Sequence, residues 1–119
     1  MRAAPPKDLR PLTIPVTRAA FQAEVEAWAK RIRVQPKVVH VRPMKRKWGS
    51  CSTSGRVSFD TTLLRQHAQF RKRVIVEELL HLRIPNHGKL FKAMLGAYLK
   101  PQTSARGQRS LPSRSQVTN

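Results

Sequence analysis

The sequence has few acidic residues, one cysteine and no long apolar run. Only 6 of its 119 residues are Asp or Glu, against 24 Lys and Arg, which gives a formal net charge of +18 at pH 7. Because Cys51 has no second cysteine to pair with, an intramolecular disulfide is excluded. No segment has the length of a membrane span, and the N-terminal residues lack the apolar stretch of a signal peptide. These absences predict a cytoplasmic protein with no membrane association.

The excess of positive charge predicts attraction to polyanions. Two runs of basic residues stand out in the sequence: Lys45, Arg46 and Lys47, and then Arg71, Lys72 and Arg73. Such runs favour nonspecific contacts with nucleic-acid phosphates. A recognisable DNA-reading motif is absent, and few aromatic side chains are available to stack on bases. Nonspecific nucleic-acid binding is therefore one hypothesis, and a solvated surface that keeps a small protein soluble is the other.

Length and composition predict one folded domain between two poorly ordered ends. Residues 1–16 carry four of the nine prolines and little periodicity, so we expect an extended lead. The apolar periodicity lies within residues 17–99, which form the predicted domain. Residues 100–119 are polar and basic, which predicts a disordered tail.

Apolar spacing and turn residues predict an α+β fold with helices around a small sheet. Apolar residues recur at helical spacing from Thr17, a suitable N-cap, to about Arg33. Strands are predicted at 38–42, 45–52 and 56–59, in an antiparallel or mixed sheet with a turn at 53–55. Two further helices are predicted at 68–82 and 87–99, with Asn86 as the cap of the second.

One short segment concentrates groups that bind metals. Glu77 and His81 are four residues apart and share a helix face, and Glu78 lies between them. Pro85 ends the helix, so His87 can arrive from another element as a third ligand. A catalytic zinc ion needs three protein ligands and one open position for water, whose pKa the ion lowers. The segment therefore predicts a metal site, with neutralisation of nearby arginines as the plain alternative for the two acids.

Two blocks of the sequence resemble the YgjP-like metal-dependent hydrolases, which are minimal zincin-type metallopeptidases. The first block is KWGSCS at 47–52, followed by Gly55, with Lys47 in place of the family's arginine. The second block runs from Glu78 to Phe91, with Gly88 in place of the family's serine. The blocks stand in the family's order, and the resemblance spans roughly residues 17–99. It implies a zincin-like α+β domain with two site-bearing helices.

The resemblance also implies roles for individual residues. Glu78 matches the family's general base, and His81 and His87 match two of its zinc ligands. Glu77 occupies the position of the remaining ligand, which is a histidine in the family. The first block lies along the family's active-site cleft, where an exposed strand edge can hold an extended peptide. This implies substrate contacts for Trp48, Gly49 and Ser50.

The residue at position 77 leaves three interpretations open. In the first, Glu77 binds zinc beside the two histidines, a ligand set known from catalytic zinc sites. In the second, the carboxylate shifts the preference toward Fe²⁺ or Mn²⁺. In the third, the site is inactive, and Glu77 only pairs with a basic residue such as Arg73, which precedes it by four positions. We rank them in that order.

The predicted function is metal-dependent hydrolysis of a peptide or protein substrate. The contrasting hypothesis is an inactive zincin-fold module that associates with nucleic acid through its basic surface. A partner subunit could complete the cleft, since longer family members carry a further part. His40 and His67 have no partners at ligand spacing, so we expect them to be structural or on the surface.

Overall fold

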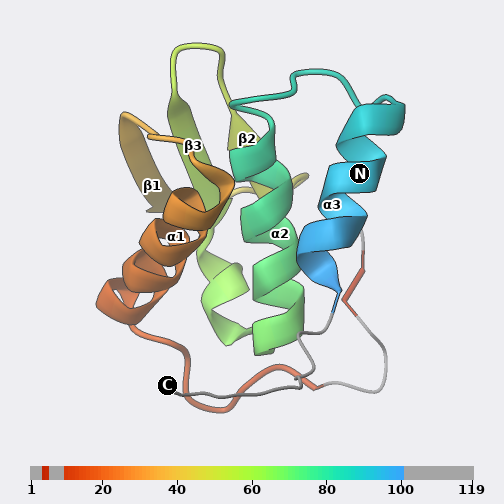
Figure 1. The fold of residues 1–119 in the computed structure, drawn as a ribbon. Helices are drawn as coiled ribbons and strands as arrows, with labels where there is room; N and C mark the ends of the chain where they lie inside the picture. Colours follow the sequence, from red (N-terminus) through yellow and green to blue (C-terminus); the bar gives the residue numbers. More distant parts are fainter. Residues whose placement is uncertain (1–3, 6–9, 101–119) are drawn as a thin grey trace, which may run out of the picture.

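The computed structural model of the chain describes residues 4–5 and 10–100 (Figure 1). Nearly all of the predicted disordered tail, and part of the predicted lead, lie outside these residues. The described elements are α1 (Arg18–Ile32), β1 (Val38–Arg42), β2 (Gly49–Cys51), β3 (Arg56–Asp60), a 3-10 helix η1 (Thr61–Arg65), α2 (Ala68–Leu80) and α3 (Lys89–Leu99). The predicted α+β class is confirmed. No described helix has both the length and the apolar character that crossing a membrane requires.

The three strands form a mixed sheet in the order β1-β3-β2. β3 runs parallel to β1 and antiparallel to β2, so β3 is the central strand and β2 has one free edge. The turn between β2 and β3 closes at Gly55, whose φ of 93° lies in the left-handed region that glycine adopts without strain. The mixed sheet is among the arrangements predicted from the sequence.

β2 is shorter than the predicted strand at 45–52, because the backbone bends through Lys45 and Arg46 before the ladder begins. The bend is held from β3, where the Asp60 carboxylate accepts a 2.8 Å hydrogen bond from the Met44 N–H. Three consecutive exposed cations also lack the alternation of a half-buried strand. The basic run therefore lies on a loop that leads into β2.

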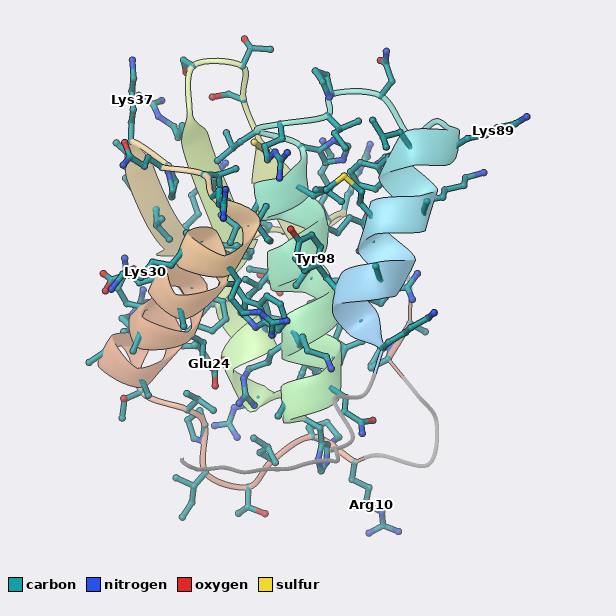
Figure 2. All side chains as sticks on the ribbon, in the orientation of Figure 1. Arg10, Glu24, Lys30, Lys37, Lys89 and Tyr98 are labelled. Carbon is teal, nitrogen blue, oxygen red and sulfur yellow. The ribbon has the colours of Figure 1, made fainter. Side chains whose placement is uncertain are left out.

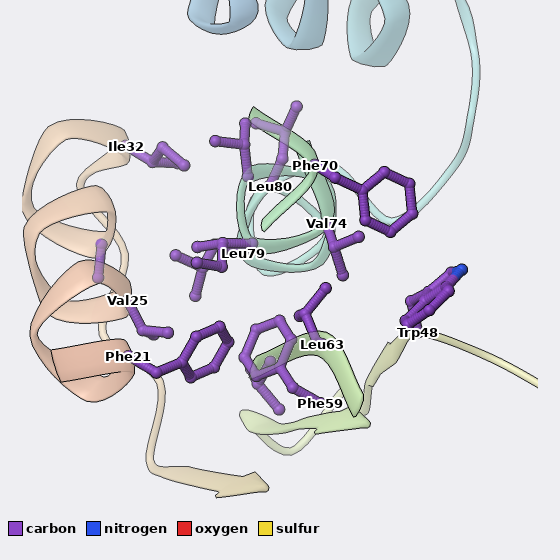
Figure 3. Close-up of a cluster of buried hydrophobic side chains, with 14 of the residues drawn as sticks. Phe21, Val25, Ile32, Trp48, Phe59, Leu63, Phe70, Val74, Leu79 and Leu80 are labelled. Atoms are coloured by element: carbon purple, nitrogen blue, oxygen red, sulfur yellow. The ribbon is translucent and has the colours of Figure 1, made fainter. Parts of the chain in front are cut away.

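α1 and α2 pack together over the sheet and form the core (Figure 1). Phe21 and Val25 of α1 point toward Phe59 of β3 and Leu79 of α2 (Figure 3). The rings of Phe21 and Phe59 meet edge to face, with centroids 5.2 Å apart. The Thr17 side chain accepts a hydrogen bond from the Ala20 N–H, which confirms the predicted N-cap.

A partly buried ion pair joins the same two helices. The Arg71 guanidinium donates to both carboxylate oxygens of Glu24, at 3.0 and 2.7 Å, and to the Gln66 carbonyl oxygen at 2.7 Å. Figure 2 labels Glu24 on the α1 side of this contact. Arg71 is only 7% exposed. The predicted basic surface of Arg71, Lys72 and Arg73 is therefore wrong for Arg71, because its charge is used inside the fold.

The connection between α2 and α3 differs from the prediction at both ends. α2 ends at Leu80, and His81 follows as its C-cap with right-handed helical backbone angles. α3 begins at Lys89 with Gly88 in the N-cap position, so the predicted start at His87 and the predicted cap Asn86 are wrong. Gly88 has no side chain to cap the helix, so this start has no side-chain cap hydrogen bond. As a result, His87 lies on a loop and can turn back toward α2.

Candidate metal centre

Three candidate ligands converge where α2 meets the loop before α3. Glu77 is in the last turn of α2, His81 is its C-cap, and His87 is in the loop. One ligand atom from each of these residues lies within 4.8 Å of the other two. The Nε2 atoms of His81 and His87 are 2.7 Å apart. The structure thus brings together the three residues that the sequence suggested as ligands.

A backbone carbonyl determines which nitrogen of His81 is free. Nδ1 of His81 lies 3.1 Å from the carbonyl oxygen of Pro85. Because a carbonyl only accepts hydrogen bonds, Nδ1 carries the proton, and Nε2 of the neutral ring holds a lone pair. That lone pair faces His87 Nε2. This is the tautomer and the outer hydrogen bond that a metal-binding histidine requires, so the donor set fits a divalent cation.

Phe91 of α3 supports both imidazole rings. Its ring stacks on His81 with centroids 4.6 Å apart at an angle of 26°, and it contacts His87 with a centroid distance of 4.6 Å. Phe91 is 2% exposed, so the core holds it in place. The sequence indicated only that Phe91 belongs to the second block that resembles the family. Its contact with the two histidine rings is seen only in the structure.

Glu78 lies beside the ligands but faces a different element. A Cβ placed on Gly49 would lie 2.8 Å from Cγ of Glu78 and 3.1 Å from the Ser58 carbonyl oxygen. β2 can therefore pack this closely against Glu78 only because residue 49 has no side chain. Burial raises the pKa of Glu78 to about 7, the charge of Glu77 adds to the rise, and the Lys47 ammonium opposes it. The carboxyl group can therefore exchange a proton near neutral pH.

A cleft of about 670 Å³ runs between β2 and α2. Glu77, Glu78, His81 and His87 line it, as do the predicted substrate contacts Trp48, Gly49 and Ser50. Trp48 is 8% exposed and packs edge to face on Phe70, so it is mainly a core residue with one side in the cleft (Figure 3). The three candidate ligands and Glu78 therefore share one solvent-accessible space.

The edge of β2 that has no strand beside it lies along this cleft; on it, Gly49 is buried and Cys51 is half-buried. Trp48 and Ser52 hydrogen-bond to β3, since the Asp60 N–H donates to the Trp48 carbonyl and the Ser52 N–H donates to the Arg56 carbonyl, both at 2.9 Å. Hydrogen-bonded pairs alternate along an antiparallel ladder, so the N–H and C=O groups of Gly49 and Cys51 point away from β3. Burial and the charge of Glu78 raise the pKa of the nearby Cys51 thiol.

The remaining predicted residues fall into separate environments. Lys45, Arg46, Lys47 and Arg73 are exposed, and Lys72 is half-buried. In the described part of the chain, no ion pair joins Glu77 to Arg73, the example of a basic partner given in the third interpretation. His67 Nε2 lies 2.7 Å from the Arg10 carbonyl oxygen, and His40 is exposed on β1. Neither belongs to the metal-binding group.

Comparison with known proteins agrees with this geometry. The sequence matches the YgjP-like family, described as a metallopeptidase domain, over residues 3–109. No curated protein sequence matches the chain. The fold is similar to that of the metallopeptidase zymogen abylysin of Pyrococcus abyssi, with a TM-score of 0.57 and 22% identity over 63% of this chain and 75% of that one. The resemblance found in the sequence is confirmed: the chain belongs to the YgjP-like metallopeptidase domain family of metal-dependent hydrolases.

Proposed function

We propose that the protein is a metallopeptidase in which Glu77, His81 and His87 bind the metal ion and Glu78 moves the proton. The observation that carries the proposal is the convergence of three ligand atoms within 4.8 Å, in the same cleft as a carboxyl group whose pKa is about 7. Structural metal sites use a fourth protein ligand, whereas three ligands leave a position for water. Among the described residues, this convergent group contains three ligands.

Zinc is the ion we propose, because two imidazoles and one carboxylate form an established catalytic zinc set. The same set also suits Fe²⁺ or Mn²⁺, which prefer more oxygen ligands. The His81 tautomer supports binding through Nε2. The position of Glu77 one turn before His81 supports binding from the same helix face.

A bound divalent ion supplies Lewis acidity that activates water and polarises a carbonyl group. In the proposed reaction, a Glu78 carboxylate oxygen takes the proton of the attacking water. The water oxygen bonds to the peptide carbonyl carbon, and the C–N bond breaks. Glu78 then delivers the proton to the leaving nitrogen, which departs as an amine. The raised pKa of Glu78 suits both steps near neutral pH.

The substrate that we propose is an extended peptide beside β2. The outward N–H and C=O groups of Gly49 and Cys51 can pair with a peptide backbone as an added strand. Ser50 lines the same cleft and would contact its side chains. The sequence prediction of substrate contacts at Trp48, Gly49 and Ser50 thus becomes a proposal that residue 49 contributes through its backbone.

Metal content and peptide hydrolysis test the proposal together. We expect about one zinc ion per chain by mass spectrometry of the purified protein, lost in both His81→Ala and His87→Ala. Glu78→Gln should keep the zinc and lose about 100-fold or more in peptide hydrolysis, because only the proton carrier changes. A folded, metal-free protein without hydrolytic activity in the presence of zinc would instead favour an inactive zincin-fold module.

A further inference from the structure

A second hollow continues the cleft and is lined by positive charge. It has a volume of about 460 Å³ and shares Arg46, Lys47 and Ser50 with the 670 Å³ cleft. None of Glu77, Glu78, His81 and His87 lines the second hollow, so it extends away from the metal-binding group. We call the cations along the two hollows the basic trough; they are Arg42, Lys45, Arg46, Lys47 and Arg73.

The cations of the basic trough form no ion pairs within the described part of the chain, although Lys47 interacts electrostatically with Glu78. The acids that line either hollow are Glu77 and Glu78, and both belong to the proposed reaction centre. No ion pair within 4.0 Å joins a cation of the trough to a described carboxylate. Arg71 is the contrast, because the fold uses its charge in a buried pair with Glu24. Cations gathered along a concave surface raise the local concentration of an anionic ligand.

The trough also adjoins the strand edge that would hold a peptide. The loop with Lys45, Arg46 and Lys47 leads directly into β2, whose free edge faces the cleft. On the opposite wall, Arg73 precedes Glu78 by five residues, which is about 7.5 Å along a helix. An extended chain paired with β2 would therefore pass from the reaction centre into the positive hollow.

We propose that the substrate is an acidic polypeptide whose Asp or Glu side chains lie in the basic trough, on one side of the cleaved bond. This inference rests on the proposed peptidase function and names the substrate class of the same site. Peptide rather than nucleic acid is favoured because the cations continue from a strand edge that pairs with peptide backbone. Trp48, an aromatic side chain of the cleft, is 8% exposed and offers little surface for stacking on bases.

Binding tests the inference without requiring turnover. The probes are a fluorescein-labelled, glutamate-rich peptide, the same peptide with glutamine at every glutamate, and labelled single-stranded DNA of equal charge. With zinc-loaded Glu78→Gln protein at low salt, we expect the acidic peptide to bind at least about tenfold more tightly than the glutamine peptide. The difference should shrink at high salt. Equal affinity for the two peptides, or DNA that binds more tightly than the acidic peptide, would overturn the inference.

Two triple variants with the same change in net charge locate the contact. Arg42→Ala/Lys45→Ala/Arg46→Ala removes three cations of the trough, whereas Lys30→Ala/Lys37→Ala/Lys92→Ala removes three exposed cations that line neither hollow. Lys30 and Lys37 point away from the body of the protein (Figure 2). The first variant should lose most of the preference for glutamate, and the second should keep it. If both variants lost the preference for glutamate equally, the preference would come from net charge, and the proposed role of the basic trough would be refuted.

Cleavage of a randomised peptide library, read by mass spectrometry, tests the one-sided arrangement. We expect Asp and Glu to be enriched on one side of the cleaved bonds; enrichment on both sides or on neither would contradict it. Should no peptide be cleaved while the acidic peptide still binds through the trough, the proposed function would fail and the binding surface would stand. Cleavage without any acidic preference would leave the function standing and refute the substrate class.

Discussion

Gly49 and Glu78 touch across the cleft, with 2.8 Å between the position of a Cβ on residue 49 and Cγ of Glu78. Gly49→Ala should therefore displace Glu78 or β2, destabilise the protein by about 1–3 kcal/mol and lower peptide hydrolysis. Gly96→Ala is the matched control, since a Cβ there meets nothing within 4 Å and the helix should gain about 0.5–1 kcal/mol. Chemical denaturation and initial rates measure the two effects. Full activity and stability in Gly49→Ala would refute the close approach.

The raised pKa of Glu78 predicts how the stability of the metal-free protein depends on pH. Burial, with the charge of Glu77, raises the pKa of Glu78 from 4.5 to about 7. Between these two pH values, the folded state therefore binds more protons than the unfolded state. The contribution of protonated Glu78 to the free energy of unfolding is then complete below about pH 4.5. It is lost as the pH rises through about 7, which lowers the free energy of unfolding by about 3 kcal/mol.

Glu78→Gln should therefore gain stability relative to the unaltered protein as the pH rises across that window. Urea unfolding with a chelator at several pH values measures the difference. Glu26→Gln, at an exposed position on α1, should show no such trend. A difference between Glu78→Gln and the unaltered protein that stays constant with pH would contradict the burial of Glu78 as an acid.

Phe91 should influence metal binding without being a ligand. Phe91→Leu keeps most of the apolar volume but removes the ring that stacks on His81 at 4.6 Å. We expect zinc affinity to fall roughly tenfold, because the imidazoles lose their orientation, and stability to fall by about 1 kcal/mol. Competition with a chromophoric chelator measures the affinity. Leu90→Ala is the control, since Leu90 is 62% exposed; equal affinities in the two variants would argue against the supporting role.

The pair between Glu24 and Arg71 should matter for stability more than a surface ion pair does. Glu24→Gln leaves a buried guanidinium without its carboxylate and should cost about 2–3 kcal/mol, less than a fully buried pair because the Glu24 side chain is 35% exposed. Urea unfolding measures the change. Glu26→Gln on the same helix should stay within about 0.5 kcal/mol, and a similarly small effect of Glu24→Gln would show that Arg71 is hydrated.

Sequence patterns correctly predicted those helices and strands in which the local preference of the residues agrees with their packing in the fold. The helix from Thr17 has a capping side chain and a regular apolar face, and the structure has it with nearly the predicted bounds. The strand at 45–52 was predicted too long, because a hydrogen bond from Met44 to Asp60 holds the chain in a bend before β2. The helix start at His87 with Asn86 as its cap was wrong, because the helix begins at Lys89 with Gly88 in the N-cap position. Arg71 belonged to a basic run in sequence, but its partner Glu24 is 47 residues away.

The grouping of the three candidate ligands was predictable because their spacing is local, whereas their environment was not. Glu77 and His81 share a helix face by spacing alone, and the structure brings His87 to them. The Pro85 carbonyl that orients His81 is a backbone group, and because every residue has one, this contact cannot be predicted from the type of residue. The contact of Gly49 with Glu78 joins segments 29 positions apart, a distance over which spacing carries no information.

The central claim is that Glu77, His81 and His87 bind one metal ion, and a crystal structure of the zinc-loaded protein at the zinc absorption edge tests it most directly. We expect one anomalous peak at about 2.0–2.2 Å from a Glu77 carboxylate oxygen and from Nε2 of both histidines, with Nδ1 of His81 still bonded to the Pro85 carbonyl. A peak bound by the histidines alone, with Glu77 turned toward Arg73, would contradict the proposed ligand set, and the absence of a peak between the histidines would contradict the metal site itself.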